Sequence, residues 1–562
     1  MVNLAPLNFM PRLRALKRRG LGPLLATLDY TTRGWYYASP LYDIIEHDDF
    51  IPKSLLMAPP ALKKGKANIG KELLENHFTL HGQTLNMGHT PDWFPETLSD
   101  DWAQELHRFS WLKHLAALPK DQGREHARDL ISHWAQHNAR CEPLSWDSEV
   151  MSTRLLNWLE QAEWLLQDAD ERFVVEFMFS LNKHANLLPK RLSWHTGGAT
   201  LLRNIKAMIY VGLCLPQRQS FALEGISLLK DQLQVLVLDD GGFIERAPSL
   251  HLWALDDLLD IHALMRKAGH TPPTLLDDCI EQMIKVLGVL RHPDGTLALF
   301  GPTDSEDGEY ATTLLQRGNG DMAPETTFLP SMGFARLVRG HSVVIMDVGT
   351  TSLAVTPAAQ HASTLAFEYS IGQHKIFVNQ GSCVFKPHLR QRARQASAYN
   401  TIELNNDSMV EVLDLKHVGR GPAQVMAHVE QEPGIGAGIE ALQDGYRHLG
   451  VKHVRRIFVA ENGLDLRGED ELTGKTPYSV KSYFHLHPKV KAKLRNKFEA
   501  ELQVPGLPPL VMKVRGGSLE IYDGSYAPSW HDHRANQILV LNGEWRQNKC
   551  TLRWGLSGHK SE

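Results

Sequence analysis

The strongest constraint on the fold is a change in the spacing of apolar residues near residue 330. Before this point, apolar residues recur three or four positions apart, as in Trp102, Leu106 and Phe109, which is the spacing of an amphipathic helix. After it, short runs rich in β-branched and aromatic residues alternate with turns, for example at 341–348 and 453–460. We therefore predict a helical part followed by antiparallel sheets stacked into a sandwich.

Length and composition limit the class of protein. A chain of 562 residues is too long for one ordinary core, so at least two domains are expected. The formal net charge of −4 argues against a dedicated nucleic-acid binder, and no apolar run approaches the length of a membrane span. The five cysteines are scattered and form no Cys-x-x-Cys pair, which disfavours a disulfide framework. With no signal peptide visible, we expect a cytoplasmic protein.

One stretch concentrates the side chains that carry chemistry. Two helical patterns between residues 194 and 251 are joined to polar loops marked by glycine. Cationic and proton-transferring side chains at the ends of packed helices suit a site for an acidic sugar polymer. The candidates in this stretch are His195, Arg203, Asn204, Glu245, Arg246 and His251.

Several strings resemble the heparinase II/III family of polysaccharide lyases. R-L-L-N-W-L-E at 154–160 is similar to its Arg-x-x-x-Trp helix, and 201–216 is similar to its central helix. H-A-S-T-L-A-F-E-Y-S-I-G at 361–372 resembles its His-Ala-Asp strand. R-Q-R-A-R-Q-A-S-A-Y-N-T-I-E-L at 390–404 resembles its R-x-x-A-x-x-x-x-H-N-T element. The later strings N-G-L-D-L-R-G-E-D at 462–470 and Y-F-H-L-H-P at 483–488 look most like an uncharacterised proteobacterial branch of the family.

The resemblance implies an incomplete (α/α) toroid followed by a β-sandwich. On this basis we expect an N-terminal extension at 1–35, a toroid at 36–330 and a β-sandwich at 331–562. It also implies an enzyme that cleaves a uronate-containing oligosaccharide or polysaccharide by β-elimination. Such a substrate is the expected partner, and a homodimer stays open.

The sequence departs from the family at positions that matter for catalysis. Ala199-Thr200 stands at the position of the family's catalytic Asn-His pair, and Leu250 at that of its catalytic tyrosine. Ser363 and Tyr399 occupy positions that supply zinc ligands in metal-bearing relatives. Because zinc needs at least three protein ligands, we expect no cofactor and disfavour a family-type zinc site.

The remaining polar residues define a candidate site for proton transfer. β-Elimination needs a neutralised carboxylate, a base for the C5 proton and an acid for the departing oxygen. His361, Tyr399, His251 and Glu245 are the catalytic candidates. The substrate-binding candidates are Arg246, Arg203, Asn204, His195, Arg390, Arg394, His292 and Asp294.

Other interpretations stay open at this point. His251 begins an apolar helical run, Arg203 and Asn204 are compatible with solvent-facing positions, and Asp294-Gly295 is a typical turn. Paired carboxylates at 239–240 and 256–257, together with Glu245, are compatible with a glycoside hydrolase on the same fold. A non-catalytic protein that binds or assembles polysaccharide is the third alternative.

Overall fold

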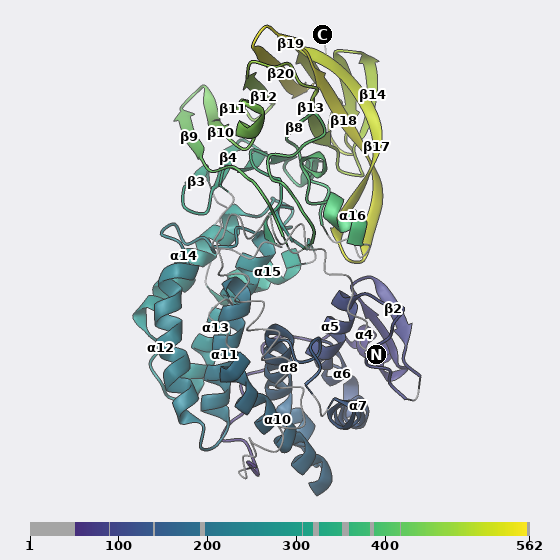
Figure 1. Cartoon of the computed structure of the whole chain (residues 1–562), viewed down its shortest axis with the longest axis vertical. Coiled ribbons are helices and arrows are strands. Elements are labelled where there is room, and N and C mark those ends of the chain that lie inside the picture. Colours follow the sequence, from purple (N-terminus) through teal and green to yellow (C-terminus); the bar gives the residue numbers. More distant parts are fainter. Residues whose placement is uncertain are drawn as a thin grey trace. The chain divides into compact units, whose positions relative to one another are not determined.

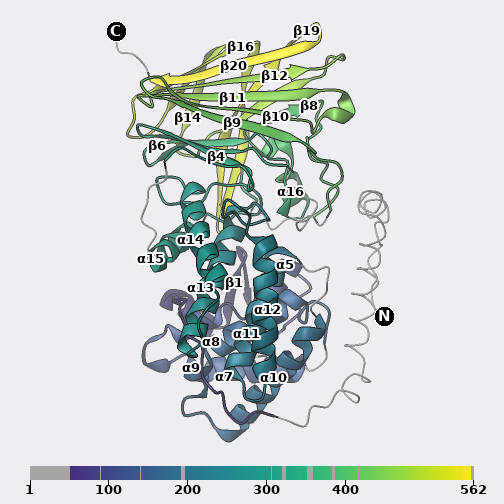
Figure 2. The same ribbon diagram turned by 90° about the vertical axis from the view of Figure 1, so that its left-hand side faces the viewer.

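A computed structural model of the chain divides into two compact units, shown in Figures 1 and 2. The structure describes residues 51–88, 90–138, 141–191, 197–305, 307–318, 325–350, 359–382, 387–415 and 417–558. One unit, called the helical unit here, contains the described residues up to Val235 together with Ala254–Asp278. The other, called the β-rich unit, contains Leu236–Trp253 and the described residues from Cys279 onward.

Over the part that the structure describes, the first half of the chain folds as a succession of helices with one short hairpin. The hairpin pairs β1 (His77–Leu80) with β2 (Gln83–Asn86). The helices are α4 (Ala67–Leu74), α5 (Asp100–Arg108), α6 (Leu112–Ala116), α7 (Arg124–His137), α8 (Ser148–Glu160), α9 (Ala162–Leu166), α10 (Glu171–Arg191), α11 (Gly198–Cys214), α12 (Gln219–Leu236), α13 (Pro248–Lys267), α14 (Thr274–Val289) and α15 (Asp307–Arg317). None of the helices among the described residues is both long and apolar enough to cross a membrane.

Local sequence explains where these helices start and which of them lie inside. The Ser99 side chain accepts a hydrogen bond from the backbone N–H of Trp102, which caps α5, and acidic residues follow in the first turn. Helix α8 is buried on nearly all sides and packs against α11, where Ser152 donates to Asn204 over 2.6 Å. Gly212 of α11 lies so close to Ala222 of α12 that a Cβ at this position would overlap its backbone nitrogen.

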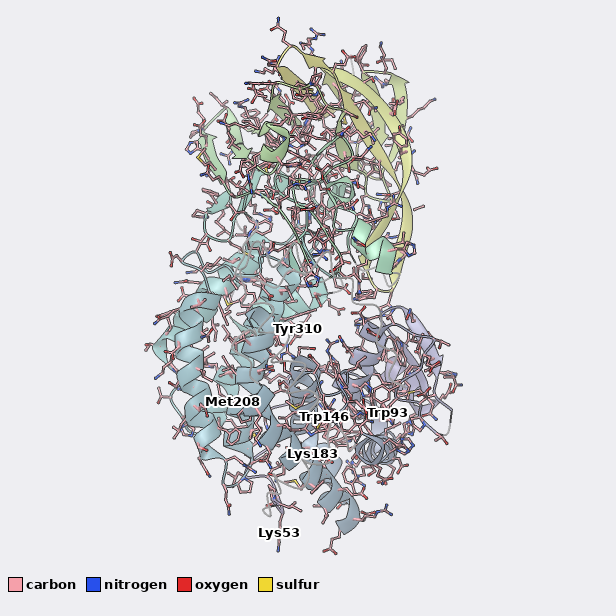
Figure 3. All side chains as sticks on the ribbon, in the orientation of Figure 1. Lys53, Trp93, Trp146, Lys183, Met208 and Tyr310 are labelled. Carbon is pink, nitrogen blue, oxygen red and sulfur yellow. The ribbon has the colours of Figure 1, made fainter. Side chains whose placement is uncertain are left out.

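Aromatic side chains fill the core of the helical unit. Trp134 and Trp158 pack edge to face at 5.5 Å, and Trp93 stacks on Phe109 at 5.8 Å. Figure 3 labels Trp93 and Trp146, which belong to this core. Such rings bury a large apolar area each, so the abundant tryptophans of the sequence are mainly structural.

The described residues of the second half of the chain form three antiparallel sheets. The five-stranded sheet has the order β3-β4-β5-β6-β7, the four-stranded sheet β17-β18-β13-β8, and the nine-stranded sheet β14-β15-β16-β20-β12-β11-β10-β9 with β19 paired to β20. The first sheet comprises β3 (Thr327–Leu329), β4 (Phe334–Arg339), β5 (Ser342–Asp347), β6 (Phe367–Ile371) and β7 (His374–Phe377). The second comprises β8 (Ile402–Leu404), β13 (Val480–His485), β17 (Gly517–Ser529) and β18 (Asp532–Gly543). The third comprises β9 (Val425–Glu432), β10 (Gly436–Gln443), β11 (Lys452–Ala460), β12 (Asp465–Thr473), β14 (Lys491–Asn496), β15 (Glu499–Gln503), β16 (Leu510–Arg515), β19 (Trp545–Arg546) and β20 (Lys549–Gly558).

These sheets share one apolar core, as expected for a sandwich. Alternate residues of β11 point inward, and Ile457 packs in the same cluster as Leu337 of β4 and Leu539 of β18. Phe367 of β6 stacks on Trp554 of β20 at 5.2 Å. The predicted helical toroid followed by an antiparallel β-sandwich is confirmed. The exact domain limits at 1–35, 36–330 and 331–562 stay a prediction.

A buried ion pair joins the neighbouring strands β11 and β12 of the nine-stranded sheet. Arg455 donates from Nε to Asp470 Oδ1 over 2.6 Å and from Nη2 to Oδ2 over 3.0 Å, and neither side chain is exposed. His453 Nε2 also bonds to Asp470 Oδ1, at 2.8 Å. Burial would raise the pKa of Asp470, but Arg455 and His453 hold it well below its usual value.

We predict that Asp470→Asn lowers the free energy of unfolding by about 3–5 kcal/mol, because it leaves the Arg455 cation buried without a counter-ion. Urea denaturation measures this loss. Since the folded-state pKa is depressed, the stabilisation is complete above about pH 4 and is lost as the pH falls further. Asp465→Asn, in the exposed Asp465–Arg467 pair of the same strand, is the control and should cost less than about 1 kcal/mol. Equal losses in the two variants would contradict this account.

Candidate functional site

The two main catalytic candidates of the β-rich unit contact each other. His361 lies in the segment before β6, and Tyr399 directly follows a single 3-10 turn at Ala396–Ala398. His361 Nδ1 and the Tyr399 hydroxyl are 2.5 Å apart, and the two rings meet edge to face. Both side chains are buried, with 6% of His361 and 2% of Tyr399 exposed. This short bond joins two groups that exchange protons readily.

The surroundings keep the Tyr399 phenol protonated. Burial raises its pKa well above the usual value, and the carboxylates of Asp347 and Glu368 add to the rise. Arg394 and a backbone hydrogen bond from Gly301 act in the opposite direction. Tyr399 is therefore a neutral proton donor at neutral pH, and Arg394 is close enough to stabilise negative charge on its oxygen.

Arg394 also holds the backbone on which His361 lies. Its Nη2 donates to the carbonyl of Gln360 over 3.0 Å, and its own carbonyl accepts from the N–H of Ala362 over 2.8 Å. Burial lowers the pKa of Arg394 to about 10, which leaves it cationic at neutral pH. Arg390 lies half-buried in α16 (Pro387–Arg392), near enough to Arg394 to influence its pKa.

Arg246 has a structural set of partners. It adopts a left-handed backbone conformation with φ of 54°, and its guanidinium donates to the carbonyls of Met332 and Thr350, each over 2.6 Å. It also forms an ion pair with Asp347, which accepts from the Ser363 hydroxyl over 2.7 Å. Arg246 therefore fastens the turn after α12 to the ends of β4 and β5, and its donors are engaged by the protein.

His251 and Glu245 are likewise buried. His251 accepts from the N–H of Phe243 at Nδ1 over 3.2 Å, and its Nε2 bonds to the carbonyl of Met283 over 2.8 Å. Burial lowers the pKa of His251 to about 4, so it stays neutral. With both ring nitrogens bonded to backbone, His251 has no nitrogen left for a substrate, and Glu245 is only 5% exposed. We leave both residues out of the proton-transfer group.

His292 and Asp294 belong to one turn. His292 is buried and its Nε2 donates to Glu368 Oε2 over 2.8 Å, while its Nδ1 lies 3.1 Å from the Ser370 hydroxyl. Asp294 Oδ1 accepts from the backbone N–H of Thr296, as an aspartate does in this type of turn. Burial would raise the pKa of Asp294, but Lys375 and the turn hold it below its usual value. These contacts are those of a structural turn.

Of the candidates in the helical unit, Arg203 belongs to an ion-pair cluster and Asn204 is bonded to a serine of a neighbouring helix. Arg203 donates from Nε to Asp257 over 2.7 Å, and Asn204 of α11 is fully buried and accepts from Ser152 of α8. Arg203 and Asn204 therefore have structural partners, rather than the solvent-facing positions that one interpretation allowed. His195 falls outside the described residues.

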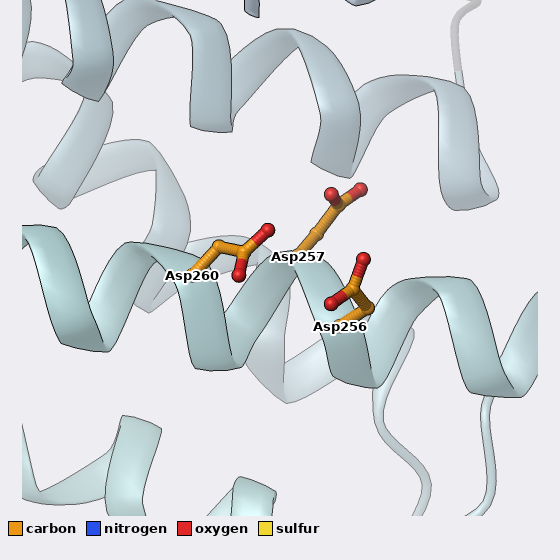
Figure 4. A group of neighbouring side chains, drawn as sticks. All are labelled: Asp256, Asp257 and Asp260. Carbon is orange, nitrogen blue, oxygen red and sulfur yellow. The ribbon is translucent and has the colours of Figure 1, made fainter. Parts of the chain in front are cut away.

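Three aspartates of α13 form the centre of this cluster (Figure 4). Asp256, Asp257 and Asp260 are buried, and their ligand atoms lie within 4.8 Å of one another, a spacing that suits a metal ion. Lys206 Nζ, however, lies 2.6 Å from Asp260 and 3.1 Å from Asp257, and Lys63 Nζ lies 2.7 Å from Asp256. The positive charge that a metal would supply is already provided by side chains.

The residues at the family's metal positions do not fit zinc. Ser363 offers a hydroxyl that already donates to Asp347, and Asp347 is paired with Arg246. The Tyr399 phenol, held neutral, is bonded to His361. Zinc is normally bound by thiolate, imidazole or carboxylate, so these donors make a poor set for it. No catalytic step is assigned to a metal.

Comparison with known proteins agrees with this architecture. The model "Heparinase II/III N-terminus" matches residues 57–320, and the model "Heparinase II/III-like, C-terminal" matches residues 321–555. The chain belongs to the heparinase II/III-like family. It is 26% identical over 526 residues to FtsZ-localized protein C of Caulobacter vibrioides, with 87% of each chain covered. It is 23% identical to heparin-sulfate lyase of Bacteroides stercoris, covering 76% of this chain and 72% of that protein.

Solved structures extend the likeness at the level of the fold. A crystal structure of heparinase III superposes with a TM-score of 0.75 at 14% identity, covering 97% of this chain and 93% of that one. Identity this low speaks for a common fold alone.

Two residues around Tyr399 escaped the sequence reasoning. Glu368 and Asp347 both influence the Tyr399 pKa, and neither was a candidate. Glu368 is the one acidic residue in the run F-E-Y-S-I of β6. The sequence does not distinguish a buried acidic residue from a solvent-facing one at such a position, because the two differ only in their contacts in the fold. The sequence feature that could have pointed to Glu368 is an acidic residue in a strand whose neighbours are nearly all apolar.

We predict that Lys206→Met destabilises the helical unit by about 3–5 kcal/mol, because it leaves Asp257 and Asp260 buried with less compensating charge. Thermal and urea unfolding measure the effect. The control Lys285→Met removes the exposed pair with Glu281 and should cost less than about 1 kcal/mol. A Lys206 variant as stable as the control would show that the cluster is not held by this ion pair.

Proposed function

We propose that this protein is a lyase that cleaves a uronate-containing polysaccharide by β-elimination. The observation that carries the proposal is the bonded pair of His361 and Tyr399, with the cation of Arg394 beside it. Family membership supports the same reaction class, since relatives of this fold include proteins named as heparin and heparan sulfate lyases.

The reaction needs three groups, and this part of the β-rich unit offers each. The C5 proton of a uronate becomes acidic when a cation or donors neutralise its carboxylate. Arg390, half-buried and close enough to Arg394 to influence its pKa, is the group we assign to the carboxylate, together with the positive charge of Arg394. The base and the acid are the imidazole of His361 and the phenol of Tyr399.

The proton steps follow from one tautomer of the pair. If His361 carries its proton on Nδ1, it donates to the Tyr399 oxygen, and the base is the lone pair of Nε2. The C5 proton passes to Nε2, the C5–H electrons form the C4=C5 double bond, and the C4–O4 bond breaks. Tyr399 gives its hydroxyl proton to O4 and regains one from Nδ1 across the 2.5 Å bond. Arg394 stabilises the transient negative charge on the phenol oxygen.

The hydrolase alternative has less support. Asp240 accepts from the backbone N–H groups of Ser331 and Met332, at 2.8 and 2.9 Å, and so holds a turn. Asp256 and Asp257 are buried in contact with Lys63 and Lys206. A hydrolase needs one carboxyl held protonated as acid and a second one free to act. Asp240 is bonded to backbone N–H groups, and Asp256 and Asp257 serve structural ion pairs.

The similarity to FtsZ-localized protein C favours a second candidate function. That relative matches over 87% of each chain, and its name describes a location with FtsZ. A non-catalytic polysaccharide-binding protein that associates with FtsZ would keep this fold. This alternative predicts saturable polysaccharide binding and association with FtsZ polymers, without a new product.

We predict that Tyr399→Phe and His361→Ala each lower turnover by roughly a hundredfold or more, as when a general acid or base is removed. A panel of uronate and neutral polysaccharides is tested, following the ultraviolet absorbance of the unsaturated uronate and the appearance of reducing ends. Tyr446→Phe is the matched control, because this buried tyrosine donates to the Ile402 carbonyl over 2.7 Å and lies outside the pair. Normal turnover of both site variants on a confirmed substrate would contradict the assignment.

We also predict that turnover is independent of zinc, because Ser363 and Tyr399 replace metal-binding side chains. Dialysis against a chelator should leave the rate and the unfolding temperature unchanged, and zinc added afterwards should restore nothing. Metal analysis of the dialysed protein provides the control for complete removal. A rate that falls on chelation and returns with zinc would show this prediction to be wrong.

A further inference from the structure

Glu368 is a fully buried carboxylate that receives hydrogen bonds from three segments. Its Oε2 accepts from His292 Nε2 over 2.8 Å and from the backbone N–H of Leu299 over 3.1 Å. Its Oε1 accepts from the backbone N–H of Asn379 over 2.6 Å. The Glu368 side chain is 1% exposed, and that of His292 is 0% exposed. A carboxylate buried this deeply is tolerated only because it is fully bonded.

The segment of Leu299 leads toward Tyr399. Leu299 is two residues before Gly301, whose backbone is one of the groups that lower the Tyr399 pKa. Asn379 Nδ2 donates to the Leu299 carbonyl over 3.2 Å, so both polar groups of the Leu299 backbone are fixed. The backbone that leads from Leu299 to Gly301 is thus held by the Glu368 carboxylate and by Asn379.

The second segment reaches the backbone of Tyr399. Asn379 Oδ1 accepts from the N–H of Asn400 over 3.0 Å. Asn400 in turn donates from Nδ2 to the carbonyl of Phe367, the residue before Glu368, over 2.8 Å. The residue that follows Tyr399 is therefore held by the same strand and the same carboxylate. The segment of Leu299 and the backbone that follows Tyr399 are thus both connected to the Glu368 carboxylate.

We propose that Glu368, oriented by His292, is a positioning residue that sets the Tyr399 hydroxyl against His361. The inference rests on the proposed function for its catalytic consequence, while its geometric content concerns the His361–Tyr399 bond alone. Glu368 contacts no substrate in this account and acts through Leu299 and Asn379.

The chemistry of the network explains why a carboxylate is required. An ionised carboxylate only accepts hydrogen bonds, so His292 must carry its proton on Nε2, and the Ser370 hydroxyl then donates to Nδ1. A glutamine at 368 would place an NH₂ group against one of these donors, and its contact would become repulsive. An aspartate, shorter by one methylene, cannot span the same segments.

The test uses the whole chain labelled with ¹⁵N-histidine and follows the His361 Nδ1 resonance, assigned by its loss in His361→Ala. In Glu368→Gln we expect this resonance to move toward the value it takes in Tyr399→Phe. On a polysaccharide that the protein cleaves, kcat should fall at least about tenfold with KM nearly unchanged, as when a reacting group is misplaced. Glu403→Gln is the matched control, since Glu403 is also buried and accepts from Tyr483 over 2.7 Å, away from the pair.

A second variant keeps the proposal testable if Glu368→Gln does not fold. Ser370→Ala retains the carboxylate but removes the hydroxyl that orients His292, and should shift the His361 resonance in the same direction by a smaller amount. The proposal is overturned if the resonance is unmoved in the folded variants, or if Glu403→Gln moves it equally. If the wild-type protein cleaves no polysaccharide, the proposed function fails, while the resonance still decides the positioning role.

Discussion

A buried charge must have a partner, and the fold around the candidate site is organised by that requirement. Glu368 satisfies it with His292 and two backbone N–H groups, and in doing so connects the segments on either side of Tyr399. Arg455 satisfies it with Asp470 and then uses its remaining nitrogen on the carbonyl of Asn400, over 2.6 Å. The backbone next to Tyr399 is therefore held by one buried anion and one buried cation. Apolar packing alone would not fix a hydroxyl to within a hydrogen bond of an imidazole.

Much of the fold could be predicted from the spacing of apolar residues. The run 255–261 gave a helical pattern and lies in α13, and 341–348 gave a strand pattern and contains β5. Periodicity works for such segments because each one buries a face, and burial is what sets the period. The hairpin of β1 and β2 was missed, since strands of four residues carry too few alternations to differ from a loop. The order in which the strands pair within each sheet could not be predicted from the sequence either, because it depends on contacts between distant segments.

The candidate site was predictable in part. His361 and Tyr399 stood out because they occupy functional positions of the resembled family, and they form a bonded pair. His251 and Arg246 looked equally chemical in the sequence, yet their partners are backbone atoms of remote residues, which no local pattern reveals. Glu368, by contrast, did not look functional in the sequence and was missed. A single acidic residue in a strand resembles a surface position until its partners are known.

The central claim is that the pair removes a proton from carbon and breaks the C–O bond without water. Digestion of a cleaved uronate polysaccharide in H₂¹⁸O, followed by mass spectrometry of the new chain ends, tests this most directly. The account predicts an unsaturated uronate at one end and no ¹⁸O introduced by the cleavage, once exchange into free reducing ends is measured on an uncleaved oligosaccharide and subtracted. A saturated product that carries one ¹⁸O per cleavage would contradict elimination and would establish hydrolysis instead.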